Sequence, residues 1–357
     1  MHNIERIPLQ DELPAGFFTV GLRPYEGLPF RPDDDPEVVR EVFRMEAPRN
    51  EMVLYTDHAS LRLVGIFPHG AAEAYFGFWE TEEALPPNRE AFALLEADAR
   101  QRGREVVIGP LHFNTFGRYR LRLGVPSWGM FDREPVNPAY YPALLGQLGY
   151  AVRSTFESRL IRKETVPDVY VDKGGLLAAL GAIPFEFIPL DEAAWVRYED
   201  EIAELVHQVF SANPAYKPVS REQFALLYNR RYAAKLCPHS SVLFRDKASG
   251  RLAAMSFCHP NYHGLPAPPR GAPDFARDFP ALPRKVLLAK SVGVHPGFRR
   301  QGLMACLGAY AMLSFRERYD EVIFCLMRSD NFSLHFSNDY PFEAAQYALY
   351  HKVLAAK

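Results

Sequence analysis

The first half of the chain alternates short apolar runs with amphipathic stretches. Apolar runs rich in aliphatic and aromatic residues predict strands, and apolar residues recurring every three or four positions predict helices. Prolines are frequent from Pro8 to Pro36, which predicts an extended N-terminal segment with little regular structure. The predicted strands are 53–55, 61–67, 74–79, 106–109 and 150–161, and the predicted helices are 37–43, 88–102 and 140–148.

The second half repeats this alternation around one long proline-rich segment. Residues 259–283 contain seven prolines, and loops of this length are often lids or binding loops. The predicted helices are 191–210, 221–236 and 303–318, and the predicted strands are 241–245, 252–258, 286–294, 321–327 and 344–353.

Both halves therefore follow one order of elements: helix, strands, helix, strand and a terminal strand. The length of 357 residues is enough for two domains, each with its own core. The pattern is that of a duplicated α/β unit. We predict a first domain over 1–165, a linker over 166–183 and a second domain over 184–357.

Composition narrows the class of protein. With 41 basic and 43 acidic residues the net charge is −2, which argues against a nucleic-acid partner because no global attraction to phosphates exists. The longest apolar run, 303–315, is too short to span a bilayer, and no signal peptide is recognised, so no membrane is expected. The cysteines, Cys237, Cys258, Cys306 and Cys325, are expected to be buried thiols in a reducing, cytoplasmic compartment.

One local motif carries chemistry, and it spans 292–304. A strand ends at Val294, Pro296 stops it, and Gly302 lies where a helix opens. The first N–H groups of a helix have no partner inside the helix, and the helix dipole is positive there. Together with Arg299 and Arg300, this turn is suited to binding a pyrophosphate.

The motif resembles the acyl-CoA-binding signature of the GNAT superfamily of N-acyltransferases. The matching positions are Val294, Pro296, Arg299 and Gly302, whereas Met304 stands where the signature has a small residue. The resemblance implies an α/β fold class of two GNAT-like domains, each a mixed central sheet flanked by helices. The second domain would bind acyl-CoA and be catalytic.

The resemblance also implies how the co-substrate, most simply acetyl-CoA, is held. The strand before the turn splays from its neighbour, and its backbone bonds the pantetheine arm. An Asn after the following strand, here Asn331, contacts the cofactor. The residues with these roles are Val292, Gly293 and Val294 for pantetheine, and Arg299, Arg300, Gln301, Gly302, Leu303 and Met304 for the pyrophosphate.

The first half has no such signature. The corresponding stretch, 80–88, contains Glu80, Glu82 and Glu83, which would repel a pyrophosphate, and two prolines. We therefore expect the first domain to be degenerate and to act as scaffold or lid.

Chemistry of this class needs a base for the attacking ammonium and an acid for the leaving thiolate. For the acid we favour Tyr340, with Ser333, His335 and Ser337 as alternatives. For the base we favour His259, with His263 nearby. The spacing of these two histidines could suggest a metal pair, but Pro260 and Gly264 argue against a helix, so no metal is expected.

The predicted function is transfer of an acyl group, most simply acetyl, from CoA to an amine of a small molecule by direct attack. One alternative is amide formation with another donor, an acyl carrier protein or an aminoacyl-tRNA. The other alternative is a non-catalytic CoA-binding module.

Overall fold

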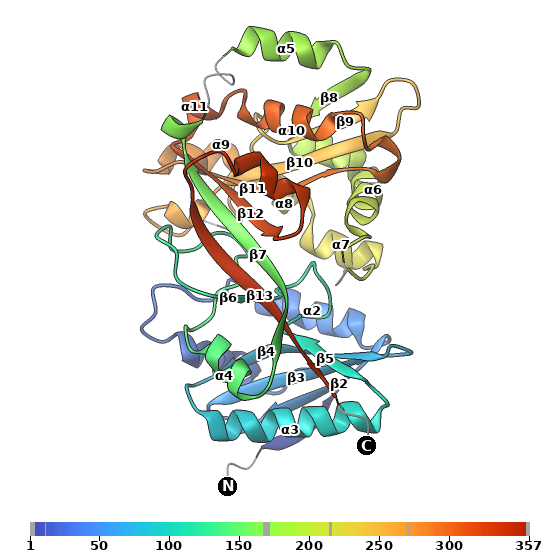
Figure 1. Cartoon of the computed structure of the whole chain (residues 1–357), viewed down its shortest axis with the longest axis vertical. Helices are drawn as coiled ribbons and strands as arrows, with labels where there is room; N and C mark the ends of the chain where they lie inside the picture. The colour runs from blue at the N-terminus through green and yellow to red at the C-terminus, as the bar shows by residue number, and fades with distance from the viewer. Residues whose placement is uncertain (1–3, 11, 167–171, 214–215, 270, 355–357) are drawn as a thin grey trace. The chain divides into compact units, whose positions relative to one another are not determined.

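The computed structural model describes residues 4–10, 12–166, 172–213, 216–269 and 271–354. The chain forms two compact units (Figure 1). The first, unit 1, contains residues 1–156 and 345–357, and the second, unit 2, contains residues 157–344. We describe each unit by itself.

The sheet of unit 1 has the strand order β1-β2-β3-β4-β5-β13, with β6 also paired to β13. Neighbouring strands are antiparallel, except that β4 and β5 are parallel. The strands are β1 (Glu5–Leu9), β2 (Asn50–Thr56), β3 (Leu61–Pro68), β4 (Glu73–Thr81), β5 (Val106–Gly109), β6 (Leu121–Arg122) and β13 (Glu343–Val353).

Helix α3 (Leu85–Gln101) covers one face of this sheet (Figure 1). Its apolar side, Ala91, Phe92, Leu95 and Ala99, is buried against residues of β2, β3 and β4. The other helical segments of unit 1 are α1 (Phe17–Leu22), η1 (Arg23–Tyr25), α2 (Pro36–Glu46) and α4 (Tyr141–Gln147).

The predicted strands and helices of the first half are all present, but two expectations are wrong: the irregular N-terminal segment and the start of the helix 88–102. The N-terminal segment contains β1 and α1, because β1 pairs along the whole of β2 and pairing with a distant strand overrides its short local signal. Helix α3 begins at Leu85 instead of Asn88. Pro86 and Pro87 fit its first turn, where no N–H group is needed.

The sheet of unit 2 repeats the pattern of unit 1, with the order β8-β9-β10-β11-β12-β7. Strands β8 to β11 are antiparallel neighbours, and β11 and β12 are parallel. The strands are β7 (Ala151–Arg162), β8 (Phe185–Pro189), β9 (Val242–Asp246), β10 (Leu252–Pro260), β11 (Val286–Val294) and β12 (Glu321–Arg328).

Two predicted helices of the second half are broken. The predicted helix 221–236 divides at Asn229, whose side chain caps a new helix by accepting from the N–H groups of Arg231 and Tyr232. The predicted helix 303–318 divides at Ser314. The helices are α5 (Lys173–Gly181), α6 (Glu192–Phe210), α7 (Arg221–Leu227), α8 (Arg230–Ala234), α9 (Phe275–Asp278), α10 (Leu303–Met312) and α11 (Phe315–Arg318).

The compact units are divided differently from the predicted domains. Strand β7 begins in unit 1 and continues into unit 2, while 345–357, including most of β13, belong to unit 1. Of the predicted linker 166–183, residues 167–171 lie outside the described residues, and Lys173–Gly181 form α5. The division into domains 1–165 and 184–357 therefore remains a prediction.

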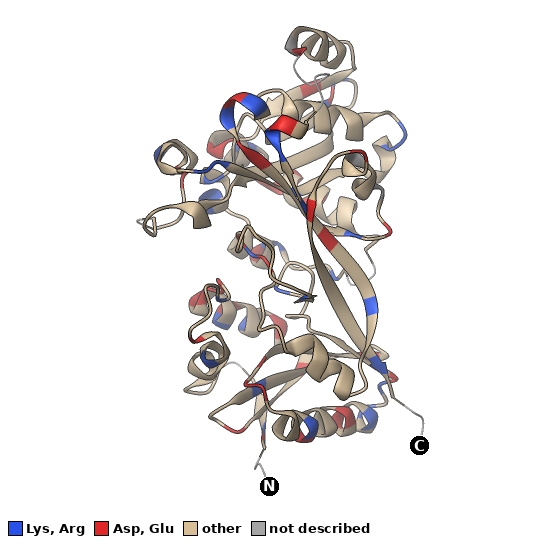
Figure 2. Cartoon of the chain, turned by 60° about the vertical axis from the view of Figure 1, so that its left-hand side comes forward, with Lys and Arg blue, Asp and Glu red and all other residues tan. Residues whose placement is uncertain are grey.

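The sequence predicted four buried thiols, and the structure confirms this for three of them. Cys237, Cys258 and Cys325 are buried, Cys306 is half-buried, and all are free thiols. Basic and acidic residues are interspersed along the chain (Figure 2). Among the helices of the described ranges, none is long and apolar enough to cross a membrane.

Candidate functional site

The predicted anion-binding turn joins β11 to α10. The N–H of His295 bonds the carbonyl of Ala253 at 2.8 Å, and the Nδ1 atom of His295 accepts from the N–H of Gly297 at 3.0 Å. A single 3₁₀ turn, η6 (Pro296–Phe298), follows. These contacts end the strand where the sequence predicted.

Two residues of the turn adopt the left-handed backbone conformation before the helix begins. Arg300 has φ 66° and Gly302 has φ 74°, a conformation that costs a non-glycine residue free energy. Left-handed residues curl a backbone so that successive N–H groups point into one concavity, which is a binding site for anions. The strained Arg300 is therefore consistent with a functional turn.

Donors are available at this turn. The first backbone bonds of α10 run from Ala305 and Cys306 to the carbonyl of Gly302, at 3.1 and 3.3 Å, so the amides of Leu303 and Met304 have no acceptor within the helix. The side chains of Arg299, Arg300 and Gln301 are exposed beside them. The side chain of Met304 packs on the core under the helix, so it does not occupy the turn.

Next to the turn, β11 and β12 separate. Their parallel register joins Val286–Ala289 to Glu321–Phe324 and ends there within the described strands, although β11 continues to Val294. Strand β11 stays paired to β10 as far as Val294. The backbone of Val292, Gly293 and Val294 thus has β10 on one side and the opening between β11 and β12 on the other. We refer to this opening as the wedge.

A bulge marks the start of the wedge. Ala289 pairs with Cys258 and Ser291 pairs with Phe257, so Lys290 is an extra residue on β11. A bulge bends its strand and increases the local twist, which accounts for the separation from β12. Gly293 allows the close approach of α6, since a Cβ atom there would overlap Cγ1 of Val209.

In unit 1 the equivalent wedge is filled by the chain itself. Strands β4 and β5 pair over Glu73–Tyr75 and Val106–Ile108, and then the N–H of Leu111 bonds the carbonyl of Phe76 at 2.8 Å. A Cβ atom at Gly77 would overlap the Leu111 carbonyl. The segment after β5 therefore lies where a ligand would otherwise reach β4.

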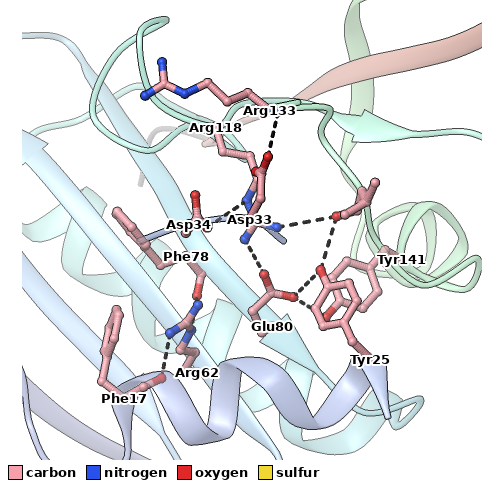
Figure 3. Close-up of polar contacts among 11 residues, drawn as sticks. Phe17, Tyr25, Asp33, Asp34, Arg62, Phe78, Glu80, Arg118, Arg133 and Tyr141 are labelled. Atoms are coloured by element: carbon pink, nitrogen blue, oxygen red, sulfur yellow. Dashed lines mark hydrogen bonds and ion pairs between the residues drawn. The ribbon is translucent and has the colours of Figure 1, made fainter. Parts of the chain in front are cut away.

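Glu80 stabilises this arrangement and does not face solvent (Figure 3). It is 1% exposed, accepts from the hydroxyls of Tyr25 and Tyr141 at 2.9 Å each, and forms an ion pair with Arg118. Burial, and then the Glu80 charge, raise the pKa of both tyrosines well above the ordinary value, so both remain donors. The expected repulsion by Glu80 is therefore wrong, because Arg118 neutralises it, and only Glu82 and Glu83 of the three are exposed.

His259, the favoured base, lies on β10 opposite Leu288. Its side chain is fully buried, its Nδ1 atom lies 2.8 Å from the carbonyl of Pro260, and its ring stacks on Tyr262 with a centroid distance of 6.1 Å. His263 is exposed in the 3₁₀ turn η4 (Tyr262–Gly264).

The candidate acid and Asn331 lie after β12. Asn331 is exposed and precedes the 3₁₀ segment η7 (Phe332–Ser337). Tyr340 is half-buried and packs against the core that contains Cys258. Ser333 is half-buried, Ser337 is buried and His335 is exposed.

The structure does not bring the acid and base candidates to one face of the sheet. Cys258 lies in the core on which Tyr340 packs, and successive residues of a strand point to opposite faces. His259 accordingly lies among Tyr232 and Tyr262 on the other face. The turn residues, in contrast, are assembled by one continuous segment.

Sequence reasoning missed Lys290 and Arg159. Lys290 is the extra residue of the bulge on β11, which forms only when β11 pairs with β10. Arg159 is buried, and its Nη1 atom contacts Ser337, 178 residues away. Local patterns contain no signal for either, since both depend on partners distant in sequence.

Comparison with solved structures shows the fold. The structure is similar to a tandem GNAT protein from the clavulanic acid biosynthesis pathway, with a TM-score of 0.54 and 13% identity over 99% of this chain and 100% of that chain. It is also similar to a probable N-acyltransferase of unknown function from Enterococcus faecalis V583, with a TM-score of 0.54 and 8% identity over 99% of this chain and 73% of that chain. No protein-family model and no curated protein matches the sequence. The predicted fold, a tandem of GNAT-like α/β units, is confirmed.

Proposed function

We propose that this protein is an acyl-CoA-dependent N-acyltransferase that moves an acyl group, most simply acetyl, from CoA to the amine of a small molecule. One observation carries the proposal: in unit 2 the wedge between β11 and β12 opens beside a turn with two left-handed residues and available amides. Both solved relatives are described by names of this class, a GNAT protein and a probable N-acyltransferase.

The residues of the turn fit the diphosphate of CoA. The amides of Leu303 and Met304 point from the positive end of α10, and Arg299 and Arg300 add charge from exposed side chains. The chain of backbone groups from Val292 to Val294 supplies donors and acceptors for an amide-containing arm in the wedge. Asn331 adds an exposed amide beyond the end of β12.

We assign the proton transfers to Tyr340 and His259, which lie on different faces of the sheet. Bound acyl-CoA supplies a thioester, which an uncharged amine can attack directly. Tyr340 carries a hydroxyl that can donate a proton to the departing sulfur, and His259 carries an imidazole that can accept the proton of the attacking ammonium. Tyr262 stacks on His259, so the loop that begins there must shift before an acceptor reaches the imidazole.

The burial of His259 favours one alternative, a CoA-binding module that transfers nothing. A protein of this kind would bind CoA at the same turn and release no thiol in the presence of amines. The alternative donors, an acyl carrier protein or an aminoacyl-tRNA, would be used in preference to free acetyl-CoA.

A thiol-release assay tests the proposal. Acetyl-CoA is incubated with the full chain and a panel of primary amines, and free CoA thiol is measured against a no-amine blank. Amine-dependent release supports transfer from CoA. Tight CoA binding without release of thiol would favour the non-catalytic CoA-binding module. The absence of any CoA binding would overturn the proposed function.

A further inference from the structure

Two consecutive residues of β7 contact the segments that lie beyond the wedge in unit 2. Ser158 is fully buried and Arg159 is 7% exposed. Strand β7 lies next to β12 in the sheet of unit 2. Because their side chains point to opposite faces of the strand, the two residues can hold two different parts of the chain.

Arg159 holds the segment that follows β12. Its Nη1 atom lies 3.0 Å from the carbonyl of Leu334, 3.0 Å from Oγ of Ser337 and 2.8 Å from Oδ1 of Asn338. Its guanidinium group also lies over the ring of Phe342, 4.1 Å from the centroid. One buried cation therefore gathers polar and aromatic groups from both sides of Tyr340.

The contact reaches Tyr340 through the backbone. The N–H of Tyr340 bonds the carbonyl of Ser337 at 3.3 Å. The hydroxyl of the same Ser337 accepts from Nη1 of Arg159. Glu157, two residues before Arg159, forms an ion pair with it and so fixes the guanidinium on the β7 side. Charge-assisted bonds of this kind are stronger than neutral ones.

Ser158 holds β12 itself. Its Oγ atom accepts from the N–H of Leu326 at 2.9 Å. Leu326 has φ 57°, a left-handed conformation that is unfavourable for leucine and persists only where the surroundings impose it. Leu326 lies just beyond the last pair of β11 and β12, so this strain falls at the edge of the wedge.

We propose that Ser158 and Arg159 form a positioning element for the acyl transfer: Arg159 sets the location of Tyr340 by ordering 334–342, and Ser158 holds the strained edge of β12. This inference rests on the proposed function. It assigns a role to a strand that the acyl-CoA signature does not include.

The experiment compares Arg159→Gln with Arg162→Ala, an exposed arginine on the same strand whose side chain is 70% exposed. We expect Arg159→Gln to lower kcat at least tenfold with the Kd for CoA changed less than twofold. Hydrogen exchange of amides in 332–342 should become at least tenfold faster. Arg162→Ala should change none of these quantities.

A double-mutant comparison separates positioning from general stability. In a Tyr340→Phe background, Arg159→Gln should lower kcat by less than threefold, because the group that it positions is already gone. Ser337→Ala, which removes one of the three contacts, keeps the test valid if Arg159→Gln does not fold, and it should show the same pattern more weakly.

Equal losses in both backgrounds, unchanged exchange, or CoA affinity that falls in parallel with kcat would overturn the inference. A wild-type chain that binds CoA and transfers nothing to any amine would overturn the proposed function and the catalytic part of this inference. In that case faster exchange in Arg159→Gln would still support the ordering of 334–342, and unchanged exchange would refute it.

Discussion

At the scale of single residues, backbone conformation decides what the candidate site can bind. Gly302 adopts φ 74° with open space around it, since a Cβ atom there would meet nothing within 4 Å. Glycine is thus favoured here by the backbone conformation and not by lack of space. A residue that tolerates the left-handed region can replace it without disturbing the turn, which allows charge to be tested separately from shape.

Gly302→Asp and Gly302→Asn form such a matched pair. Both side chains tolerate the left-handed region, so both variants should fold. The aspartate carboxylate should repel the diphosphate, and we expect it to weaken CoA binding by about 2–3 kcal/mol relative to asparagine. Calorimetry with CoA measures the difference, and equal affinities of the two variants would contradict the location of the site.

His259→Ala tests the assignment of the base. An amine is more fully protonated at lower pH, so the variant should lose most activity at the lower end of a pH 7–9 series. A weakly basic amine, which is uncharged throughout, should partly restore the rate. A pH–rate profile equal to that of the wild type would remove His259 from the mechanism.

His112 in unit 1 should make stability depend on pH. Burial, and then the charges of Arg118 and Arg62, hold the pKa of its imidazole well below the ordinary value. As pH falls below about 6.5, this histidine is protonated in the unfolded chain but stays neutral in the folded chain. The free energy of unfolding therefore falls by up to about 1.4 kcal/mol per pH unit. His112→Phe, which can still stack on Phe78, should flatten this dependence. Urea unfolding at pH 5.5, 6.5 and 7.5 gives the free energy of unfolding of both proteins. If this free energy changes with pH equally in the wild type and in His112→Phe, the role of His112 is contradicted.

At the scale of elements, the wedge depends on how closely α6 approaches β11. Val209, in the last turn of α6, lies against the position that a side chain at Gly293 would occupy. The bulge at Lys290 and the end of pairing with β12 lie on the same strand. A displacement of α6 would therefore move the backbone that is proposed to contact the pantetheine arm.

Gly293→Ala should destabilise the protein by about 1–3 kcal/mol, the usual cost of overpacking, and should weaken CoA binding. Val209→Ala removes the overlapping methyl group, so the double variant should recover part of both losses. Thermal unfolding and calorimetry measure them. A Gly293→Ala protein with unchanged CoA affinity would show that the position of α6 does not shape the wedge.

At the scale of the whole molecule, one architecture occurs twice with different outcomes. Both units place a parallel pair of strands after an antiparallel run, and both separate that pair after a few residues. In unit 1 the segment beginning at Leu111 closes the opening, and Arg118 ties that region to Glu80. In unit 2 the corresponding opening lies beside the turn that we propose to bind the diphosphate of CoA.

We therefore predict one CoA per chain. Calorimetric titration of the wild type should give a stoichiometry of one, and Gly302→Asp should weaken that single binding event. Two saturable sites, or a site that persists at full strength in Gly302→Asp, would mean that the filled wedge of unit 1 opens to a ligand.

Much of the fold follows from patterns that are local in the chain. The strands around 61–67, 106–109 and 286–294 are apolar runs whose bounds agree with β3, β5 and β11. Helix α6 starts where the sequence predicted it, and the side chain of Asp191 caps it by accepting from the N–H of Ala194. In these segments the local pattern was sufficient to locate the element.

The sequence by itself determined the duplicated α/β pattern and the turn between β11 and α10, because proline, glycine and the helix that follows act within a dozen residues. Only the tertiary structure decided where the pairing of β11 with β12 ends, that Glu80 is buried against Arg118, and that Arg159 holds the segment of Tyr340. It also decided that His259 and Tyr340 lie on different faces of the sheet. The physical reason is that each of these features joins residues distant in sequence, so its free energy depends on packing and burial that no local pattern records.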